Sequence, residues 1–186
     1  MLTIFSCPKP FQGHINVIQR NAIKSWTLLK PKPEIILIGD EEGTAEICKE
    51  FGLRHVPKVE RNEYGTPLVS SIFEIGQSEA TNSLLCYVNA DIILMSDFLP
   101  AVQRISKYPF LMVGQRWDLD VDETVSFDNV QWESWLRAQV VEKGRLHAVT
   151  GMDYFVFPRD MYHDIPSFAV GRPGWDNWMV YRARFQ

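Results

Sequence analysis

Asn89, Ala90 and Asp91 follow the most apolar run of the chain, Leu84 to Val88, and their side chains suit metal chemistry. Successive side chains on an extended backbone point to opposite sides, so Asn89 and Asp91 can face one ion together. Amide and carboxylate oxygens are suitable ligands for Mg²⁺ or Mn²⁺. The same residue types are also common where a chain merely turns after a strand. The pattern therefore indicates either a pair of metal ligands or a turn.

Polar side chains also follow the other apolar runs. They are Ser6, Pro8 and Lys9 after the first run, Asp40, Glu41 and Glu42 after the second, and Arg159 and Asp176 after the last. In open α/β sheets, ligands bind beyond the carboxyl ends of the strands. An acidic edge of this kind repels a diphosphate unless a divalent cation lies between them. Lys9 and Arg159 are the candidate cations for a diphosphate, although most Lys and Arg residues are simply solvated at a surface.

The elements that must position these residues alternate short apolar runs with helical patterns, which is typical of a mostly parallel sheet covered by helices. The expected strands are 2–6, 34–39, 53–59, 84–88, 110–113 and 148–157. We expect helices over 15–29, after a cap at Thr44, after Thr66 and Pro67, from Asp97, over 133–143 with Trp135 inward, and from Pro173 or Gly174. This last pattern is still helical at Gln186, which suggests a missing C-terminal extension. No repeat or linker interrupts the order, so we predict one domain, 1–186.

Bulk properties narrow the class of protein. A chain of 186 residues, 46% of them hydrophobic, is long enough for one sizeable core. A net charge of -4 argues against a nucleic-acid partner, which needs a basic face. Cys7, Cys48 and Cys86 are odd in number and lack a C-x-x-C spacing, so a reducing, cytoplasmic location fits best. We find neither a signal peptide nor a spanning segment, and expect a soluble protein or one peripheral to a membrane.

Taken in order, the segments resemble the GT-A glycosyltransferases, particularly the family 2-like branch. TIFSCPKP is similar to that family's opening strand, and EIILIGDEEG to its second strand, which ends in an acidic residue. VSSIFEIGQSEATNSLLCYVNADIIL resembles the helix and strand that lead into its Asp-X-Asp motif. GMDYFVFPRDMY and GRPGWDNWMVYRAR resemble its acceptor-side strand and the start of its catalytic helix. The resemblance covers nearly the whole chain and implies a three-layer α/β/α sandwich with a central mixed, mostly parallel sheet.

The resemblance also implies roles for particular residues. Ser6 and Pro8 correspond to the wall of the nucleotide pocket, and Asp40 to a contact with the base or ribose. Asn89 and Asp91 correspond to the metal motif, with Asp91 making the direct bond to Mn²⁺ or Mg²⁺. The implied donor is a nucleotide sugar, for which UDP is favoured, and the implied acceptor is a glycan or another hydroxyl compound.

The start of the last helical pattern matches the catalytic side of that family, with two departures. Asp176 corresponds to the Asp that deprotonates the acceptor hydroxyl in inverting members. Asn89 stands where the first Asp of the metal motif is usual, and an amide oxygen can still serve there. Trp175 replaces an acidic residue that often precedes the base, so Trp175 and Trp178 become candidates for stacking on a sugar ring. Core packing is the alternative for both, and it is favoured for Trp178.

Three further features have open interpretations. Asp153, among apolar neighbours, is either a second catalytic carboxylate or a structural acceptor for buried amides. His163 is a weak metal candidate, since none of the four histidines has an i, i+4 partner and zinc chemistry is not indicated. The acidic run 118–128 is expected to be a mobile loop that could order over bound donor.

The function predicted from the sequence is metal-dependent transfer of a sugar from a nucleotide-diphosphate donor to an acceptor hydroxyl. A single displacement would invert the anomeric carbon, although the sequence leaves a retaining outcome open. The alternative is a noncatalytic or truncated nucleotide-sugar-binding module, which Asn89 and the helical pattern at Gln186 favour. The first strand is not followed by G-x-G-x-x-G, which argues against a dinucleotide-dependent oxidoreductase. The single glycine of SCPKPFQGH argues against a sugar-nucleotide pyrophosphorylase, which needs a glycine-rich phosphate loop.

Overall fold

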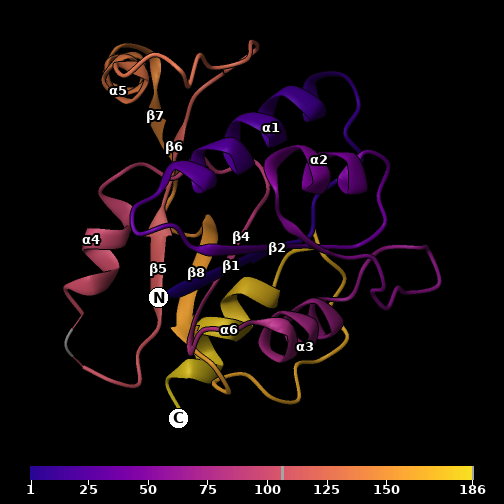
Figure 1. Cartoon of the computed structure of the whole chain (residues 1–186). Coiled ribbons are helices and arrows are strands. Elements are labelled where there is room, and N and C mark those ends of the chain that lie inside the picture. Colours follow the sequence, from indigo (N-terminus) through magenta and orange to yellow (C-terminus); the bar gives the residue numbers. More distant parts are fainter. Residues whose placement is uncertain (106, 186) are drawn as a thin grey trace.

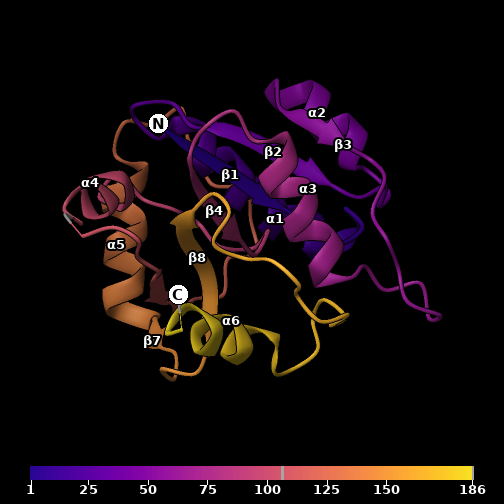
Figure 2. The ribbon, with the colours of Figure 1, turned by 90° about the horizontal axis from the view of Figure 1, so that it is seen from below.

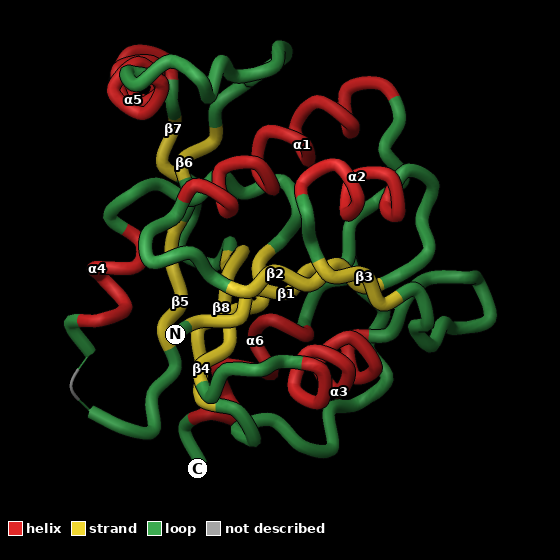
Figure 3. Tube along the Cα trace, in the orientation of Figure 1, coloured by secondary structure: helices red, strands yellow, loops and turns green. Residues whose placement is uncertain are grey.

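The computed structural model describes residues 1–105 and 107–185, in which one central sheet lies between two layers of helices (Figure 1). The sheet contains β1 (Leu2–Ser6), β2 (Glu34–Ile38), β3 (Arg54–Val56), β4 (Leu84–Val88), β5 (Met112–Gln115) and β8 (Met152–Pro158), in the order β3-β2-β1-β4-β8-β5. The helices are α1 (Gly13–Leu28), α2 (Thr44–Phe51), α3 (Val69–Glu79), α4 (Phe98–Gln103), α5 (Trp132–Lys143) and α6 (Trp175–Ala183). Helices α1 and α2 cover one face of the sheet, and α3 and α6 cover the other (Figure 3). The predicted three-layer α/β fold is confirmed.

Strand direction decides which residues meet at the carboxyl ends of the parallel strands, which we call the functional edge of the sheet. Strands β1 to β4 run parallel to one another, whereas β8 runs antiparallel to both β4 and β5. The beginning of β8 therefore lies beside the carboxyl end of β4, and the end of β8 lies at the opposite edge of the sheet. The sheet is mixed and mostly parallel, as predicted.

Each face of the sheet carries its own hydrophobic core. On one side Trp26 of α1 is fully buried, because Ile15, Ile18, Ala22 and Trp26 recur at the spacing of one helical face. On the other side, Phe73 of α3 stacks with Tyr87, at 5.1 Å between ring centroids. The view from below shows α3 and α6 on this face (Figure 2). These two cores make the sheet a rigid platform for its edge.

A small extension rises from the sheet between β5 and β8. It contains the two-stranded sheet of β6 (Trp117–Asp118) and β7 (Arg145–Leu146), with α5 between them in sequence, and we call residues 116–151 the arm (Figure 1). The acidic segment that we expected to be mobile belongs to the arm. One of its anchors is the buried Asn21, which donates to the Glu123 carbonyl oxygen at 2.9 Å and accepts from the Val125 nitrogen at 3.0 Å.

Several local predictions are wrong in instructive ways. Helix α2 begins at Thr44 after Gly43, whose φ of 86° is left-handed, so Thr44 is not the cap and its buried Oγ1 has no hydrogen-bond partner among the described residues. Helix α3 begins at Val69 because Pro67 and Leu68 instead form bridges to Arg61 and Ala169.

Later elements also differ from the expectation. Helix α6 ends at Ala183, so the helix does not continue to the end of the described chain. Trp135 is 49% exposed rather than inward, since α5 packs on the protein mainly through Leu136. Strand β3 is shorter than predicted, and β5 begins at Met112 rather than Phe110.

The structure also describes the state of the three cysteines and the character of the helices. Cys7, Cys48 and Cys86 are all free thiols. Burial raises the pKa of Cys7 to about 12. Within the described residues, none of the helices is both long and apolar enough to span a bilayer.

Candidate functional site

The site is centred on the hydrogen bonds between the end of β4 and the beginning of β8. Asn89 donates from Nδ2 to Asp153 Oδ1 at 2.9 Å, and its backbone nitrogen donates to the Asp153 carbonyl oxygen at 2.9 Å. The Tyr87 hydroxyl group donates to Asn89 Oδ1 at 3.1 Å. Both ends of the Asn89 amide are therefore used, and this pattern defines its orientation.

A chain of charged groups leads from Asp153 into the arm. Arg116 donates from Nη1 to Asp153 Oδ2 and from Nε to Asp118 Oδ1, the second bond measuring 2.7 Å. His147 Nδ1 lies 2.7 Å from the other oxygen of Asp118. Hydrogen bonds from His147 and Arg116 hold the pKa of Asp118 below its usual value. Both carboxylate oxygens of Asp153 are thus occupied, one by an amide and one by a guanidinium group.

Asp91 is exposed, whereas Asp153 is buried. Desolvation by the surrounding protein, together with repulsion from Asp153, raises the pKa of Asp91, whereas Lys9 and Arg116 lower it in part. Within the described chain, Asp91 forms no ion pair at 4.0 Å or less. An unpaired carboxylate close to a second one is a place where a cation is stabilised.

A cavity of about 830 Å³ opens beside these groups. Asp91, Asp153 and Arg116 line it together with other charged side chains, Asp97, Arg104 and Arg137, and apolar side chains of α4, α5 and the arm form much of the rest. This combination of apolar walls and a few convergent polar groups is typical of small-molecule sites. Ser6, Pro8, Asp40, Asn89 and Asp176 do not line this cavity.

Lys9 is held near Asp91 by a buried glutamine. Gln19 of α1, which is 2% exposed, accepts a bond from the Lys9 backbone nitrogen at 2.7 Å and donates to the Lys9 carbonyl oxygen at 2.8 Å. The Lys9 side chain remains exposed. The loop after β1 therefore presents a cation from a rigid backbone.

Ser6 and Pro8 do not occupy the positions that the resemblance implied. Ser6 is fully buried, and its hydroxyl group donates to the Val88 carbonyl oxygen at 2.6 Å, so it joins the ends of β1 and β4. Pro8 is buried as well. The expectation that Ser6 forms the surface of a nucleotide pocket is therefore wrong, because its side chain has no exposed area.

Asp40 lies after β2 and is exposed, as a ligand contact requires. It pairs with Arg61 at 2.5 Å, and the same guanidinium group contacts Glu41 at 2.8 Å. The hydrogen bond from Arg61 lowers the pKa of Asp40. Arg61 was not predicted, because it lies 21 residues from Asp40 in a segment without a motif.

Asp176 lies at the beginning of α6, where its Oδ1 accepts from the Asn177 nitrogen at 2.8 Å. Trp175 is 7% exposed and packs against Tyr87, with ring centroids 5.4 Å apart. The Trp175 ring therefore belongs to the core, which was the alternative to stacking on a sugar. Core packing of Trp178 is confirmed by its contact with Phe168, at 6.0 Å between ring centroids.

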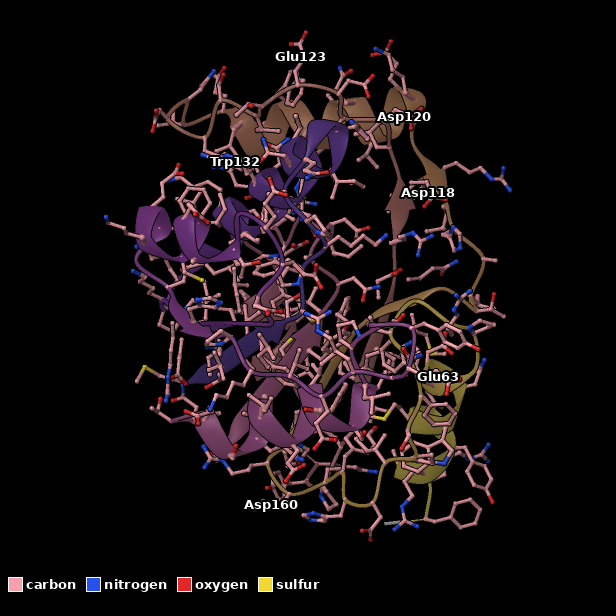
Figure 4. The ribbon with its side chains drawn as sticks, turned by 90° about the vertical axis from the view of Figure 1, so that its right-hand side faces the viewer. Glu63, Asp118, Asp120, Glu123, Trp132 and Asp160 are labelled. Atoms are coloured by element: carbon pink, nitrogen blue, oxygen red, sulfur yellow. The ribbon has the colours of Figure 1, made fainter. Side chains whose placement is uncertain are left out.

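Arg159 was predicted at the diphosphate edge, and this is wrong. Because β8 is antiparallel, Arg159 follows it at the opposite edge, where it bonds the carbonyl oxygens of Ala80 and Asn82. The neighbouring Asp160 lies far from Asp118 of the arm (Figure 4). His163 is exposed at that same far edge, in a separate polar hollow that Arg159 and Asp160 also line.

The donor set at Asp91 fits a divalent ion only with help from a ligand. Among the described residues, no three His, Cys, Asp or Glu side chains form a group able to hold a metal ion. Mg²⁺ is usually bound through one or two carboxylates together with waters and substrate phosphates. Asp91, with Asn89 and Asp153 beside it, fits this pattern.

Sequence reasoning brought together Asn89 and Asp91 but missed their neighbours. His147 reaches Asp118 across 29 residues of sequence, and Arg116 reaches Asp153 across 37. The nearest local signal is the alternation of charge in Arg116-Trp117-Asp118, directly after an apolar run. That signal does not say which carboxylate Arg116 would reach.

No protein-family model and no curated protein sequence matches this chain. Among solved structures, a mannosyltransferase from Pyrobaculum calidifontis, in complex with GDP-Man and Mn²⁺, is similar with a TM-score of 0.56 and 14% identity, over 98% of this chain and 51% of that one. A protein from Desulfovibrio desulfuricans G20, described as a nucleotide-diphospho-sugar transferase, gives a TM-score of 0.60 at 8% identity, over 99% and 75% of the two chains. A 4-diphosphocytidyl-2C-methyl-D-erythritol synthase from Anaerococcus prevotii gives 0.53 at 14% identity, over 97% and 81%.

These similarities establish the class of fold. The chain has the GT-A fold of nucleotide-diphospho-sugar transferases. It spans about half the length of the Pyrobaculum mannosyltransferase. At identities of 8 to 14%, the likeness carries over the architecture, and the chemistry has to be argued from the residues of this chain.

Proposed function

We propose that this protein transfers a sugar from a nucleotide-diphosphate donor, with a UDP-sugar favoured, to the hydroxyl group of an acceptor. The observation that carries this proposal is the meeting of Asn89, Asp91 and Asp153 at the edge of the sheet. The carboxyl ends of the parallel strands lie there, which is where open α/β sheets bind their ligands. The adjoining cavity of about 830 Å³ provides space for an acceptor or for the donor sugar.

Asp91 is the proposed direct ligand of Mn²⁺ or Mg²⁺, and Asn89 supports it. When bound, such an ion neutralises the charge that develops on the leaving diphosphate. Lys9, positioned by Gln19, supplies a second positive charge on the same side. Asp40, paired with Arg61, is the proposed contact to the base or ribose of the donor.

Transfer requires that the acceptor oxygen bond to the anomeric carbon while the bond from that carbon to the diphosphate oxygen breaks. The acceptor proton must then pass to a base. Both oxygens of Asp153 already accept hydrogen bonds. Asp176 uses only Oδ1 in the bonds of the described residues, and therefore is the first candidate base, with Asp153 the second. A single displacement of this kind inverts the anomeric carbon.

A noncatalytic nucleotide-sugar-binding module remains the second candidate function. Asp176 does not line the cavity that Asp91 and Asp153 share, and this observation favours the alternative. Nucleotidyl transfer, the activity named for the Anaerococcus protein, has less support, because the segment from the end of β1 to the start of α1 carries a single glycine, Gly13.

Two measurements test the proposal. Calorimetry should detect UDP or GDP binding with Mn²⁺ and a large loss of affinity in excess EDTA, because the acidic edge repels a diphosphate without the ion. Equal affinity in both conditions would exclude the metal and leave Lys9 as the phosphate ligand. Slow hydrolysis of a bound nucleotide sugar, measured by nucleotide release, would distinguish a transferase from a binding module, which releases none.

A further inference from the structure

We propose that Arg116 is a positioning residue that competes with the divalent cation for Asp153. In this way Arg116 makes ion binding depend on the nucleotide. The inference rests on the proposed function, because it concerns the ion that serves the donor diphosphate. It adds a role for a residue that neither the sequence pattern nor the fold assigns.

The guanidinium group of Arg116 contacts three side chains. Nη1 bonds to Asp153, Nε bonds to Asp118, and Nη2 lies 3.1 Å from His147 Nδ1. The His147 backbone nitrogen also donates to the Arg116 carbonyl oxygen at 2.9 Å. These contacts place a permanent positive charge against Asp153, which lines the same cavity as Asp91.

Gly151 leaves the space that this arrangement needs. A Cβ atom at Gly151 would lie 2.2 Å from His147 Cδ2 and 3.3 Å from Arg116 Nη1. The approach of His147 to Arg116, whose guanidinium group contacts Asp153, therefore depends on the missing side chain. Packing against residues of the arm therefore fixes the position of the Arg116 guanidinium group.

The positive charge of Arg116 lowers the affinity of the Asp91 and Asp153 carboxylates for a divalent cation. With Arg116 in place, the charge of Asp153 is already compensated, and Asp91 is the remaining uncompensated carboxylate. One carboxylate is a weak site for Mn²⁺ alone, and the guanidinium group repels a second cation nearby. A bound diphosphate restores negative charge and oxygen ligands, so ion and nucleotide should bind with positive coupling.

The experiment titrates Mn²⁺ alone into the purified chain and measures bound ion by electron paramagnetic resonance. We expect Arg116→Gln to bind Mn²⁺ about tenfold more tightly than the parent, since removing the guanidinium group frees Asp153. Arg116→Lys keeps the charge and should remain within about threefold of the parent. Arg20→Gln, which removes an arginine of a distant surface ion pair, is the matched control and should change nothing.

A double-mutant cycle identifies the route of the effect. In the Asp153→Asn background, Arg116→Gln should no longer tighten Mn²⁺ binding, because the carboxylate for which it competes is gone. The proposal is overturned if folded Arg116→Gln binds Mn²⁺ no more tightly than the parent. If that variant does not fold, Arg116→Lys decides instead, since a loss of Mn²⁺ affinity in it would contradict competition.

Failure of this inference and failure of the proposed function give different results. Absence of nucleotide binding to the parent protein in Mn²⁺ would end the proposed function, whatever Arg116→Gln does to Mn²⁺ alone. Unchanged Mn²⁺ affinity in Arg116→Gln would end this inference while nucleotide binding persists. In parallel, the coupling between Mn²⁺ and UDP should weaken in Arg116→Gln, which calorimetry at several Mn²⁺ concentrations measures.

Discussion

Asn89 bridges Tyr87 and Asp153, with its Oδ1 3.1 Å from the Tyr87 hydroxyl oxygen and its Nδ2 2.9 Å from Asp153 Oδ1. This relationship explains why an amide suits a position where the resembling family usually has a carboxylate. An aspartate there would have no hydrogen to donate to Asp153 and would add a like charge beside it. An asparagine at position 89 is therefore compatible with the neighbouring Tyr87 hydroxyl group and Asp153 carboxylate, and an aspartate is less so.

Replacing Asn89 with Asp should lower the free energy of unfolding by about 1 to 3 kcal/mol without divalent ions, because it removes a donor and places two carboxylates together. Mn²⁺ should reduce that loss, since it binds between like charges. Urea unfolding with and without Mn²⁺ measures both effects. Asn129→Asp, at an exposed position of the arm, is the control. An equal loss in both conditions would show that the ion does not reach this carboxylate.

Asp91→Asn and Asp176→Asn should separate binding from transfer. Loss of the Asp91 carboxylate should raise the Mn²⁺ requirement and weaken nucleotide affinity. Asp176→Asn should leave both nearly unchanged and lower turnover by about 10²- to 10⁴-fold, the usual contribution of a general base. Calorimetry and a transfer assay give the two readouts. A loss of turnover below about tenfold in Asp176→Asn would mean that Asp176 is not the general base, and Asp153 would become the candidate.

Asp40→Ala should weaken donor binding with little effect on stability, because Asp40 is exposed and lies at a strand end. Arg61 would keep its bond to Glu41. The dissociation constant for UDP and the melting temperature are the measurements. Glu46→Ala, at an exposed position of α2, serves as the comparison. A marked fall in melting temperature for Asp40→Ala alone would make Asp40 a structural residue.

Asn21→Ala should release the acidic segment of the arm. The variant loses two hydrogen bonds to the backbone at Glu123 and Val125, and leaves buried polar groups without partners, which costs about 1 to 3 kcal/mol. Hydrogen exchange of the amide groups in residues 119–131 should accelerate relative to the strands. Exchange that rises equally throughout the protein would point to global destabilisation instead of a local anchor.

Glu34 supplies a pH-dependent contribution to stability. Its burial raises its pKa, but hydrogen bonds from Thr3 and Thr81 and the nearby Arg54 outweigh this, so the pKa of Glu34 lies below its ordinary 4.5. A depressed carboxylate pKa stabilises the fold above the unfolded-state value, and the contribution is lost as pH falls through the folded-state value. The difference in unfolding free energy between the parent and Glu34→Gln should therefore be constant above about pH 5 and shrink below it. A difference that grows with acidification would contradict this assignment.

Local sequence patterns predicted those parts of the fold that depend on local physics. The run Leu84 to Val88 becomes β4 with the expected bounds, because a short apolar segment between polar residues has few alternatives. The same reasoning correctly placed Asn89 and Asp91 at the edge of the sheet. It could not give the direction of β8, because an apolar run reads alike in a parallel and an antiparallel strand. Arg159 was therefore assigned to the wrong edge.

The rest of the site depends on contacts between distant segments. Nothing within a few residues of Arg116 indicates that its guanidinium group meets Asp153, 37 positions later. The buried position of Trp175 likewise follows from how α6 docks on Tyr87, and not from the residues around it. Such pairings are set by tertiary packing.

The antiparallel course of β8 also governs when the site can form. Asp153 reaches Asn89 only after the chain has returned across 64 residues and paired β8 with β4 in register. A slip of one residue would turn Tyr154 toward the position of Asp153 and invert the strand's two faces. Contacts of such long sequence separation form late, because the entropy cost of closing the loop comes before the contacts stabilise the fold. Competence to bind should therefore appear during refolding with the last strand, and a nascent chain that ends before β8 would carry Asp91 without its site.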